Sequence, residues 1–271
     1  MADRINHAFE HARAQGRIAL APFVTVGFPS PAATPGIVRA IVDAGADVIE
    51  LGVPFSDPLA EGPTIQKSSF AALEKGVTPQ LCIDMAASLR KDGIKTPFIL
   101  MGYYNPVLAF GPEKFCQKAA AAGVDGLIVA DLPPEEAGPL TDIANSRGLA
   151  VIPLLALTST DARVAVGCAR AGGFIYCVSV LGVTGARAAV SERVRGLVEK
   201  VRQHSRLPVG VGFGISKPEH VADVAQFADG AVVGSALIDV IGRGPENDAA
   251  ERAGMFIKSL VPGTRKAAVR K

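Results

Sequence analysis

The chain has 271 residues, of which 49% are hydrophobic, 20% are charged and only 6% are aromatic, with no tryptophan among them. This length is close to the ~250 residues of a (β/α)8 barrel, and the composition is typical of an α/β protein whose core consists mainly of Val, Ile, Leu and Ala. With 28 Lys and Arg against 26 Asp and Glu, the net charge of +2 is too small to indicate a nucleic acid or an anionic membrane as a partner.

An amphipathic helix is predicted at 3–15, and short apolar segments that predict buried strands follow it to the C-terminus. These eight segments are 19–26, 47–51, 97–101, 125–130, 149–154, 174–179, 208–212 and 230–234. Between them, apolar residues spaced three and four apart predict helices. The helical segments are 34–44, 79–90, 112–122, 134–146, 160–170, 190–203 and 217–226, with a last helix after Gly244.

Alternating strands and helices predict parallel pairing with right-handed crossovers. We therefore expect residues 1–271 to form a single (β/α)8 TIM barrel domain, with an extra N-terminal helix and a short extra helix after the eighth strand. An open doubly wound sheet is the alternative, because a strand count does not prove closure. The basic residues 264–271 are expected to form a loose tail.

The chain shows no signal-peptide pattern and no run of 18 apolar residues, so we expect a cytoplasmic protein. Its cysteines are widely spaced, without a CxxC motif, which predicts reduced, mostly buried thiols and no metal site. They are Cys82, Cys116, Cys168 and Cys177.

The segment ELGVPFSDPLAEGP, residues 50–63, carries three acids at and beyond the end of a predicted strand. Because side chains alternate along a strand, Glu50 lies on the face opposite Ile49 and Leu51. If that apolar pair meets the helices, Glu50 points into the barrel at the carboxyl end of its strand, where barrels carry their chemistry. Partial desolvation there raises the pKa of a carboxyl group and suits it to proton transfer near neutral pH. A Glu that caps a loop or pairs with a basic residue is the alternative.

Asp57 and Glu61 lie in the loop of this segment, which contains three prolines. A long loop over the mouth of a barrel is often a lid or part of the site, although a solvated surface loop explains these acids equally well.

The last three predicted strands each run into glycines, at 182–185, 212–214 and 234–235. Backbone N–H groups beside glycine can approach an anion, and Ser235 would place the N-terminus of a short helix beside them. These loops are the recurrent phosphate site of barrel enzymes, so we expect a phosphate ester, although any one of the glycines can be a simple turn residue.

Seven residues near strand ends are expected to face the space between the phosphate site and Glu50. They are Phe23, Leu100, Tyr103, Leu127, Leu154, Tyr176 and Phe213. The four aromatic rings among them predict a flat, apolar ligand body, with a hydroxyl available from Tyr176, although core packing alone explains any one of them. The chain has no P-loop, no HExxH and no nucleophile elbow, which leaves proton-transfer chemistry such as isomerisation or aldol-type cleavage.

Residues 50–66 closely resemble the signature of the tryptophan synthase alpha subunit family. Shorter matches to that family lie at 24–30, 101–106, 131–135, 182–185 and 211–215. The resemblance implies a lyase of tryptophan biosynthesis (EC 4.2.1.20) that cleaves indole-3-glycerol phosphate to indole and glyceraldehyde 3-phosphate by a retro-aldol reaction.

The resemblance also implies roles for individual residues. Glu50 would be the acid and base, Glu61 would accept a hydrogen bond from the ring N–H, and Tyr176 would be the active-site tyrosine. The remaining groups are phosphate-binding (Gly185, Gly214, Gly234 and Ser235), indole-binding (Phe23, Leu100, Leu127, Leu154 and Phe213) and concerned with loop closure and signalling to a partner (Asp57 and Thr184).

No cofactor is expected in this chain, because the family's pyridoxal phosphate (PLP) is carried by a beta subunit in an α2β2 heterotetramer. The family commonly has Asp at the position of Glu61, whose arm is one methylene longer, and a misplacement of ~1 Å can cost about a hundredfold in rate. Three alternatives stay open: a free-standing lyase for the same substrate, a non-catalytic activating subunit, and an isomerase built on another phosphate-binding barrel.

Overall fold

The computed structural model describes residues 3–178, 187–212 and 214–266. The strands in these ranges form one parallel sheet of nine strands. They are β1 (Ala19–Thr25), β2 (Ile49–Gly52), β3 (Phe98–Gly102), β4 (Gly126–Val129), β5 (Ala150–Val151), β6 (Leu154–Ala156), β7 (Ile175–Val178), β8 (Val209–Gly212) and β9 (Gly230–Val233).

The sheet is closed. Its order runs β5-β4-β3-β2-β1-β9-β8-β7-β6, and the two strands at the ends of this order follow each other in the chain. Only Ile152 and Pro153 separate them; Ile152 N–H still bonds Leu127 O at 2.9 Å, and Pro153 O accepts from Tyr176 N–H at 3.1 Å. Proline has no N–H to continue the ladder, so the predicted strand 149–154 is split in two. The TIM barrel expected from the sequence is confirmed, with its fifth strand bent at Pro153.

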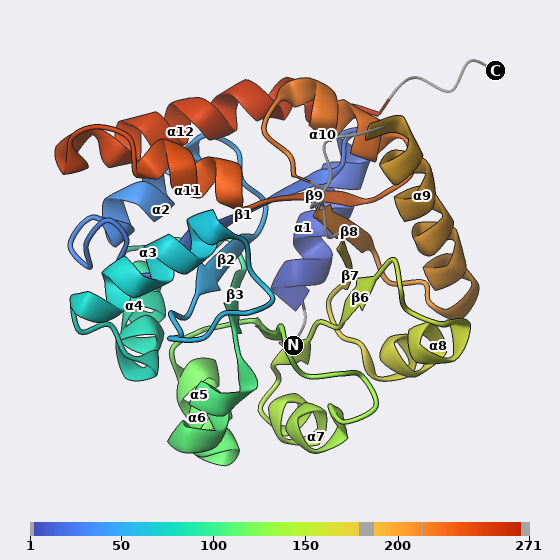
Figure 1. The fold of residues 1–271 in the computed structure, drawn as a ribbon, viewed down its shortest axis with the longest axis horizontal. Coiled ribbons are helices and arrows are strands. Elements are labelled where there is room, and N and C mark those ends of the chain that lie inside the picture. The colour runs from blue at the N-terminus through green and yellow to red at the C-terminus, as the bar shows by residue number, and fades with distance from the viewer. Residues whose placement is uncertain (1–2, 179–186, 213, 267–271) are drawn as a thin grey trace.

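The helices surround the strands (Figure 1). They are α1 (Asp3–Ala14), α2 (Thr34–Asp43), α3 (Pro63–Glu74), α4 (Pro79–Lys91), α5 (Tyr104–Phe110), α6 (Pro112–Ala121), α7 (Gly138–Ser146), α8 (Asp161–Arg170), α9 (Arg187–His204), α10 (Pro218–Ala225), α11 (Ser235–Ile241) and α12 (Ala249–Leu260), with 3-10 turns at Glu246–Asp248 and Val261–Thr264. Six of the helices, α2, α3, α4, α6, α7 and α10, have proline in the first turn, where its missing N–H costs nothing.

The extra helix α11 follows the last strand as expected, whereas α3 and α5 were not predicted. The buried face of α3 contains Ser68 and Ser69, so this helix lacks a strong apolar period. Ser68 can be buried because its hydroxyl bonds that of Thr25 in β1 at 2.7 Å. None of the described helices is long and apolar enough to cross a membrane.

Helix α1 covers the amino-terminal end of the barrel. Its Ile5 and Phe9 belong to the cluster of buried side chains that fills the barrel interior. Glycines at two strand starts make room for them: a Cβ at Gly126 would lie 3.3 Å from Ile5, and one at Gly230 would lie 2.9 Å from Phe9. This leaves the opposite end, where the strands finish, as the open mouth.

A buried carboxylate holds α1 and α4 to the amino-terminal end of the barrel. Asp125 is 2% exposed and bonds Arg4 of α1 at 2.6 Å, Arg90 of α4 at 2.7 Å and the N–H of Phe98 at 2.8 Å. Because its oxygens are shared by two cations and a peptide group, the burial of the charge is compensated.

The C-terminal segment stays bound to the barrel beyond residue 264, where the sequence predicts the start of a loose tail. Thr264 is 2% exposed and its carbonyl accepts from Ile18 N–H at 2.8 Å, while Lys266 N–H bonds Gly16 O at 2.9 Å. The expectation that the loose tail begins at 264 is therefore wrong for 264–266, and residues 267–271 lie outside the described part of the chain.

Candidate active site

Glu50 lies in the middle of the closed sheet, paired in register with Phe23 of β1 and Ile99 of β3. Its neighbours Ile49 and Leu51 pack on the helix side, whereas Val48, on its own face, packs in the barrel interior. The carboxyl group is fully buried, and neither of its oxygens has a hydrogen-bond partner among the described residues. The alternative in which Glu50 caps a loop or pairs with a base is therefore wrong. A buried polar group left unpaired is costly, and it indicates that a ligand supplies the partner.

Burial raises the pKa of Glu50 from an ordinary 4.5 to about 8, and the nearby charge of Glu61 contributes in the same direction. At neutral pH the group is therefore mostly protonated. A buried carboxylic acid whose pKa lies near 8 can give up a proton and take one back within the physiological pH range.

The backbone of Glu61 is held at both of its polar groups. Its N–H bonds Pro58 O at 3.0 Å, and its carbonyl accepts from the Gln66 side-chain amide at 2.9 Å. Partial burial raises the pKa of the Glu61 carboxyl group as well. Gln66 of α3 is thus bonded to the loop of residues 53–62, called the acid loop below. The sequence does not predict this bond, because it does not predict α3.

Tyr176 of β7 lies in the barrel interior with its ring buried. Burial raises the pKa of its hydroxyl, and the charges of Glu50 and Glu61 raise it further, so the tyrosine stays protonated. A Cβ at Gly212 of the adjacent strand would lie 2.6 Å from its Oη, so glycine makes room for the hydroxyl there. The structure thus brings Glu50, Glu61 and Tyr176 within electrostatic reach of one another.

The residues expected around an apolar ligand are only partly in place. Leu154 packs in the interior, and the ring of Phe23 fills the space beside Gly52, where a Cβ would lie 2.3 Å from Cζ. Phe23 pairs in register with Glu50, whereas Leu100 pairs with Leu51 and with Leu127. Leu100 and Leu127 therefore face the helices, as Leu51 does, and line a cavity with Val107 and Phe115.

The assignment of Leu100 and Leu127 to the ligand pocket is therefore wrong. Their chain neighbour Ile128 belongs to the interior cluster, and Met101 packs against it. Phe213 lies outside the described residues.

The strand ends expected to bind phosphate come together at adjacent strands. Gly212 of β8 pairs with Val232 of β9, which places Gly214 and Gly234 at equivalent points just beyond the two strands. Gly214 is exposed with a φ of 55°, and Gly234 precedes the first residue of α11, Ser235. The first N–H groups of a helix have no partner within it, so the N-terminus of α11 has donors to offer. Thr184 and Gly185 fall outside the described residues.

Asp57 lies apart from the buried acids. Its side chain is exposed and accepts a hydrogen bond from Ser56 Oγ at 2.5 Å. The four cysteines are free and buried, and no group of three or more His, Cys, Asp or Glu side chains among the described residues could hold a metal ion.

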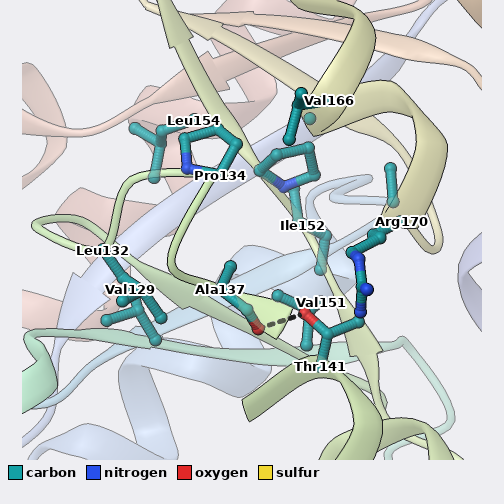
Figure 2. A pocket seen from close by; sticks show the side chains of 13 residues that line it. Val129, Leu132, Pro134, Ala137, Thr141, Val151, Ile152, Leu154, Val166 and Arg170 are labelled. Carbon is teal, nitrogen blue, oxygen red and sulfur yellow. Dashed lines mark hydrogen bonds between the residues drawn. The ribbon is translucent and has the colours of Figure 1, made fainter. Parts of the chain in front are cut away.

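A separate pocket lies between α7, α8 and the split strand (Figure 2). It encloses about 410 Å³ of space, counting the part open to solvent, and Val151, Leu154 and Val166 are among its lining. Arg170 is the charged residue of the lining, and its guanidinium bonds Asp142 at 3.2 Å. Without an acid among its lining residues, this pocket is not the site of proton transfer.

Comparison with known proteins identifies the family. Residues 9–265 match the family model described as tryptophan synthase alpha chain. The tryptophan synthase alpha chain of Chloroflexus aggregans is 48% identical over 264 residues, covering 97% of this chain and 99% of that one. That of Caulobacter vibrioides is 50% identical over 239 residues, covering 88% and 87%. The crystal structure of the alpha chain from Legionella pneumophila superposes with a TM-score of 0.88 at 36% identity, covering 98% of both chains. The chain therefore belongs to the tryptophan synthase alpha chain family, and its activity is that of a lyase of tryptophan biosynthesis that cleaves indole-3-glycerol phosphate.

Proposed function

We propose that Glu50 is the acid and base of this retro-aldol cleavage. The observation that carries the proposal is its buried, unpartnered carboxyl group with a pKa of about 8. Glu50 gives its proton to the ring carbon that bears the glycerol chain, which leaves a positive charge on the ring nitrogen. Glu50, now ionised, takes the proton of the adjacent hydroxyl of the chain. The O–H electrons form the aldehyde carbonyl, and the electrons of the broken C–C bond return to the ring.

Glu61 and Tyr176 assist in different ways. The carboxylate of Glu61 accepts a hydrogen bond from the ring N–H and stabilises the positive charge as it develops there. Tyr176 stays protonated because its pKa is raised by burial and by the two acids, so its hydroxyl acts as a donor that orients the substrate.

The phosphate is bound by backbone N–H groups rather than by a cation. Gly214, Gly234 and Ser235 supply them at the ends of β8 and β9, together with Gly185, and the N-terminus of α11 adds a favourable dipole. Among the described residues, Phe23, Met101, Ile128 and Leu154 enclose the ring.

The partner is proposed to be a PLP-containing beta subunit in a cytoplasmic α2β2 complex, with residues 1–271 acting as one domain. Support comes from the family and from the surface near the acid loop. Leu59 of that loop, two residues after the exposed Asp57, is 90% exposed, and Leu108 of α5 is 48% exposed. Exposed apolar side chains on loops around a mouth are typical of a docking surface.

Indole release from indole-3-glycerol phosphate by the purified chain, with and without a beta subunit, tests the proposal. We expect slow release alone and faster release in the complex. Equal rates would support a free-standing lyase, and undiminished release by a Glu50→Gln variant in the complex would support a non-catalytic, activating chain.

A further inference from the structure

Tyr103, immediately after β3, contacts the loop that carries Glu61. Its side chain is buried, with 6% exposed, and its hydroxyl accepts a hydrogen bond from the N–H of Ala60 at 3.1 Å. The N–H of Ala60 belongs to the peptide that joins Leu59 to Ala60, so this bond holds the backbone one residue before Glu61. The neighbouring bonds from Pro58 and Gln66 act on Glu61 itself. The hydroxyl of Tyr103 is therefore one of three groups whose hydrogen bonds hold the backbone at Ala60 and Glu61.

The ring of Tyr103 also packs on this loop. It lies 5.2 Å from the ring of Phe55, centroid to centroid, with the planes tilted by 30°. Burial raises the pKa of the Tyr103 hydroxyl, and the charge of Glu61 raises it further. The tyrosine therefore stays protonated, and its pKa depends on the charge of Glu61.

Tyr103 is in turn fixed from the next strand. The N–H of Tyr104 bonds the Asp131 carboxylate, beyond β4, at 2.8 Å. The loops after β2, β3 and β4 are thus linked in series, from Glu61 through Tyr103 to Asp131. A rigid second layer of this kind is what holds a reacting group to within a fraction of an ångström.

We propose that Tyr103 is a positioning residue that sets the reach of Glu61 toward the substrate ring by holding the N–H of Ala60. The role matters more here than with a shorter acid, because Glu61 has an additional rotatable bond whose freedom must be restricted at the backbone. The proposal rests on the role of Glu61 in the proposed function.

The test is a double-mutant cycle in the α–β complex between Tyr103→Phe and Glu61→Gln. The Phe variant keeps the ring on Phe55 and removes only the acceptor. We expect kcat to fall roughly ten- to a hundredfold with KM changed less than about threefold. In the Glu61→Gln background, the same substitution should change the rate less than about twofold, because the group that Tyr103 positions is already neutral.

Tyr104→Phe is the matched control, since it removes a hydroxyl from the adjacent residue and leaves its N–H in place. Single-turnover assays with enzyme in excess, followed for hours, measure the slow variants. A Tyr103→Phe variant within twofold of the parent would overturn the proposal, as would an equal loss in both backgrounds. If Glu61→Gln itself retains full activity, the proposed role of Glu61 fails instead, and the two failures are distinguished.

Discussion

The carboxyl group of Glu61 lies close enough to Glu50 for its charge to raise the pKa of Glu50 beyond the effect of burial alone. Two acids that interact in this way titrate as a pair, and the more deeply buried member keeps its proton longer. Glu50 is that member, which agrees with its proposed role as proton donor and with the proposed negative charge on Glu61. The two acids therefore differ in their affinity for a proton before any substrate binds.

Replacing Glu50 with Gln should abolish cleavage while the substrate still binds. The amide has nearly the same shape but cannot deliver the proton, so indole release should fall at least about 10²- to 10⁴-fold. Isothermal titration with the substrate should show a Kd within about threefold of the parent. A loss of binding with preserved turnover of the bound fraction would contradict the acid–base role.

The rate of cleavage should fall as the pH rises. The active form of Glu50 is protonated, so kcat/KM should decline through a pH of about 8 in the free enzyme. In a Glu61→Gln variant the neighbouring charge is absent, so this decline should move to lower pH, with the midpoint read from a pH profile of the residual activity. A midpoint that stays in place or moves to higher pH would show that the two acids do not interact.

Glu50 should make the protein less stable as the pH rises, and Glu50→Gln should remove that dependence. The folded-state pKa of about 8 lies above the ordinary 4.5, so the favourable contribution is complete below 4.5 and is lost as the pH rises toward 8. The loss corresponds to on the order of 3 to 5 kcal/mol.

Denaturant unfolding at pH 5 and at pH 8 measures the effect of Glu50 on stability. The gain in stability of the Gln variant over the parent should be larger at pH 8. Glu251→Gln, at an exposed position of α12, is the matched control and should show no such trend. An equal gain at both pH values would mean that Glu50 is ionised in the folded protein.

Shortening Glu61 to Asp should have a moderate effect on kcat. The carboxylate moves back by one methylene, which is about 1 Å, while the three backbone anchors of the loop are unchanged. We expect a reduction of up to about a hundredfold from misplacement alone, with Glu61→Ala falling further. Steady-state kinetics on both variants check this order. A more active Asp variant would show that the loop is already set for the shorter acid.

Asp125→Asn should destabilise the protein without changing its chemistry. The substitution leaves Arg4 and Arg90 without their shared charge at a site only 2% exposed, which should cost about 3 to 5 kcal/mol. The matched control is Asp142→Asn at the exposed pair with Arg170, which should cost less than about 1 kcal/mol. Thermal unfolding measures both, and kcat at a temperature where the variants stay folded should match the parent.

The sequence predicts the barrel well because its strands are buried on both faces and read as short apolar runs between helices. It also predicts the direction of Glu50, because one acid in an apolar run marks its face of the strand. The sequence does not predict that Leu100 and Leu127 face the helices, for the opposite reason. Their strands are apolar on both faces, so composition does not distinguish inside from outside, and only the register with Leu51 does.

Contacts made across the chain are the part that the sequence does not predict. The bend at Pro153 depends on which carbonyls and N–H groups stay paired on either side. Helix α3 depends on a hydroxyl pair between Ser68 and Thr25, and the anchoring of Glu61 depends on Tyr103, which follows a different strand. In each case the decisive hydrogen bond joins residues far apart in sequence, where local patterns carry no information.

Helix α1 covers the amino-terminal ends of the strands, so the described part of the barrel opens toward their carboxyl ends. Ile5 and Phe9 of α1 fill the amino-terminal end, where glycines at two strand starts let the strands pack closely against them. We therefore expect substrate to reach Glu50, and products to leave it, on the side of the loop that carries Glu61. Whatever protein covers that rim therefore controls both the admission of the phosphate ester and the destination of the indole.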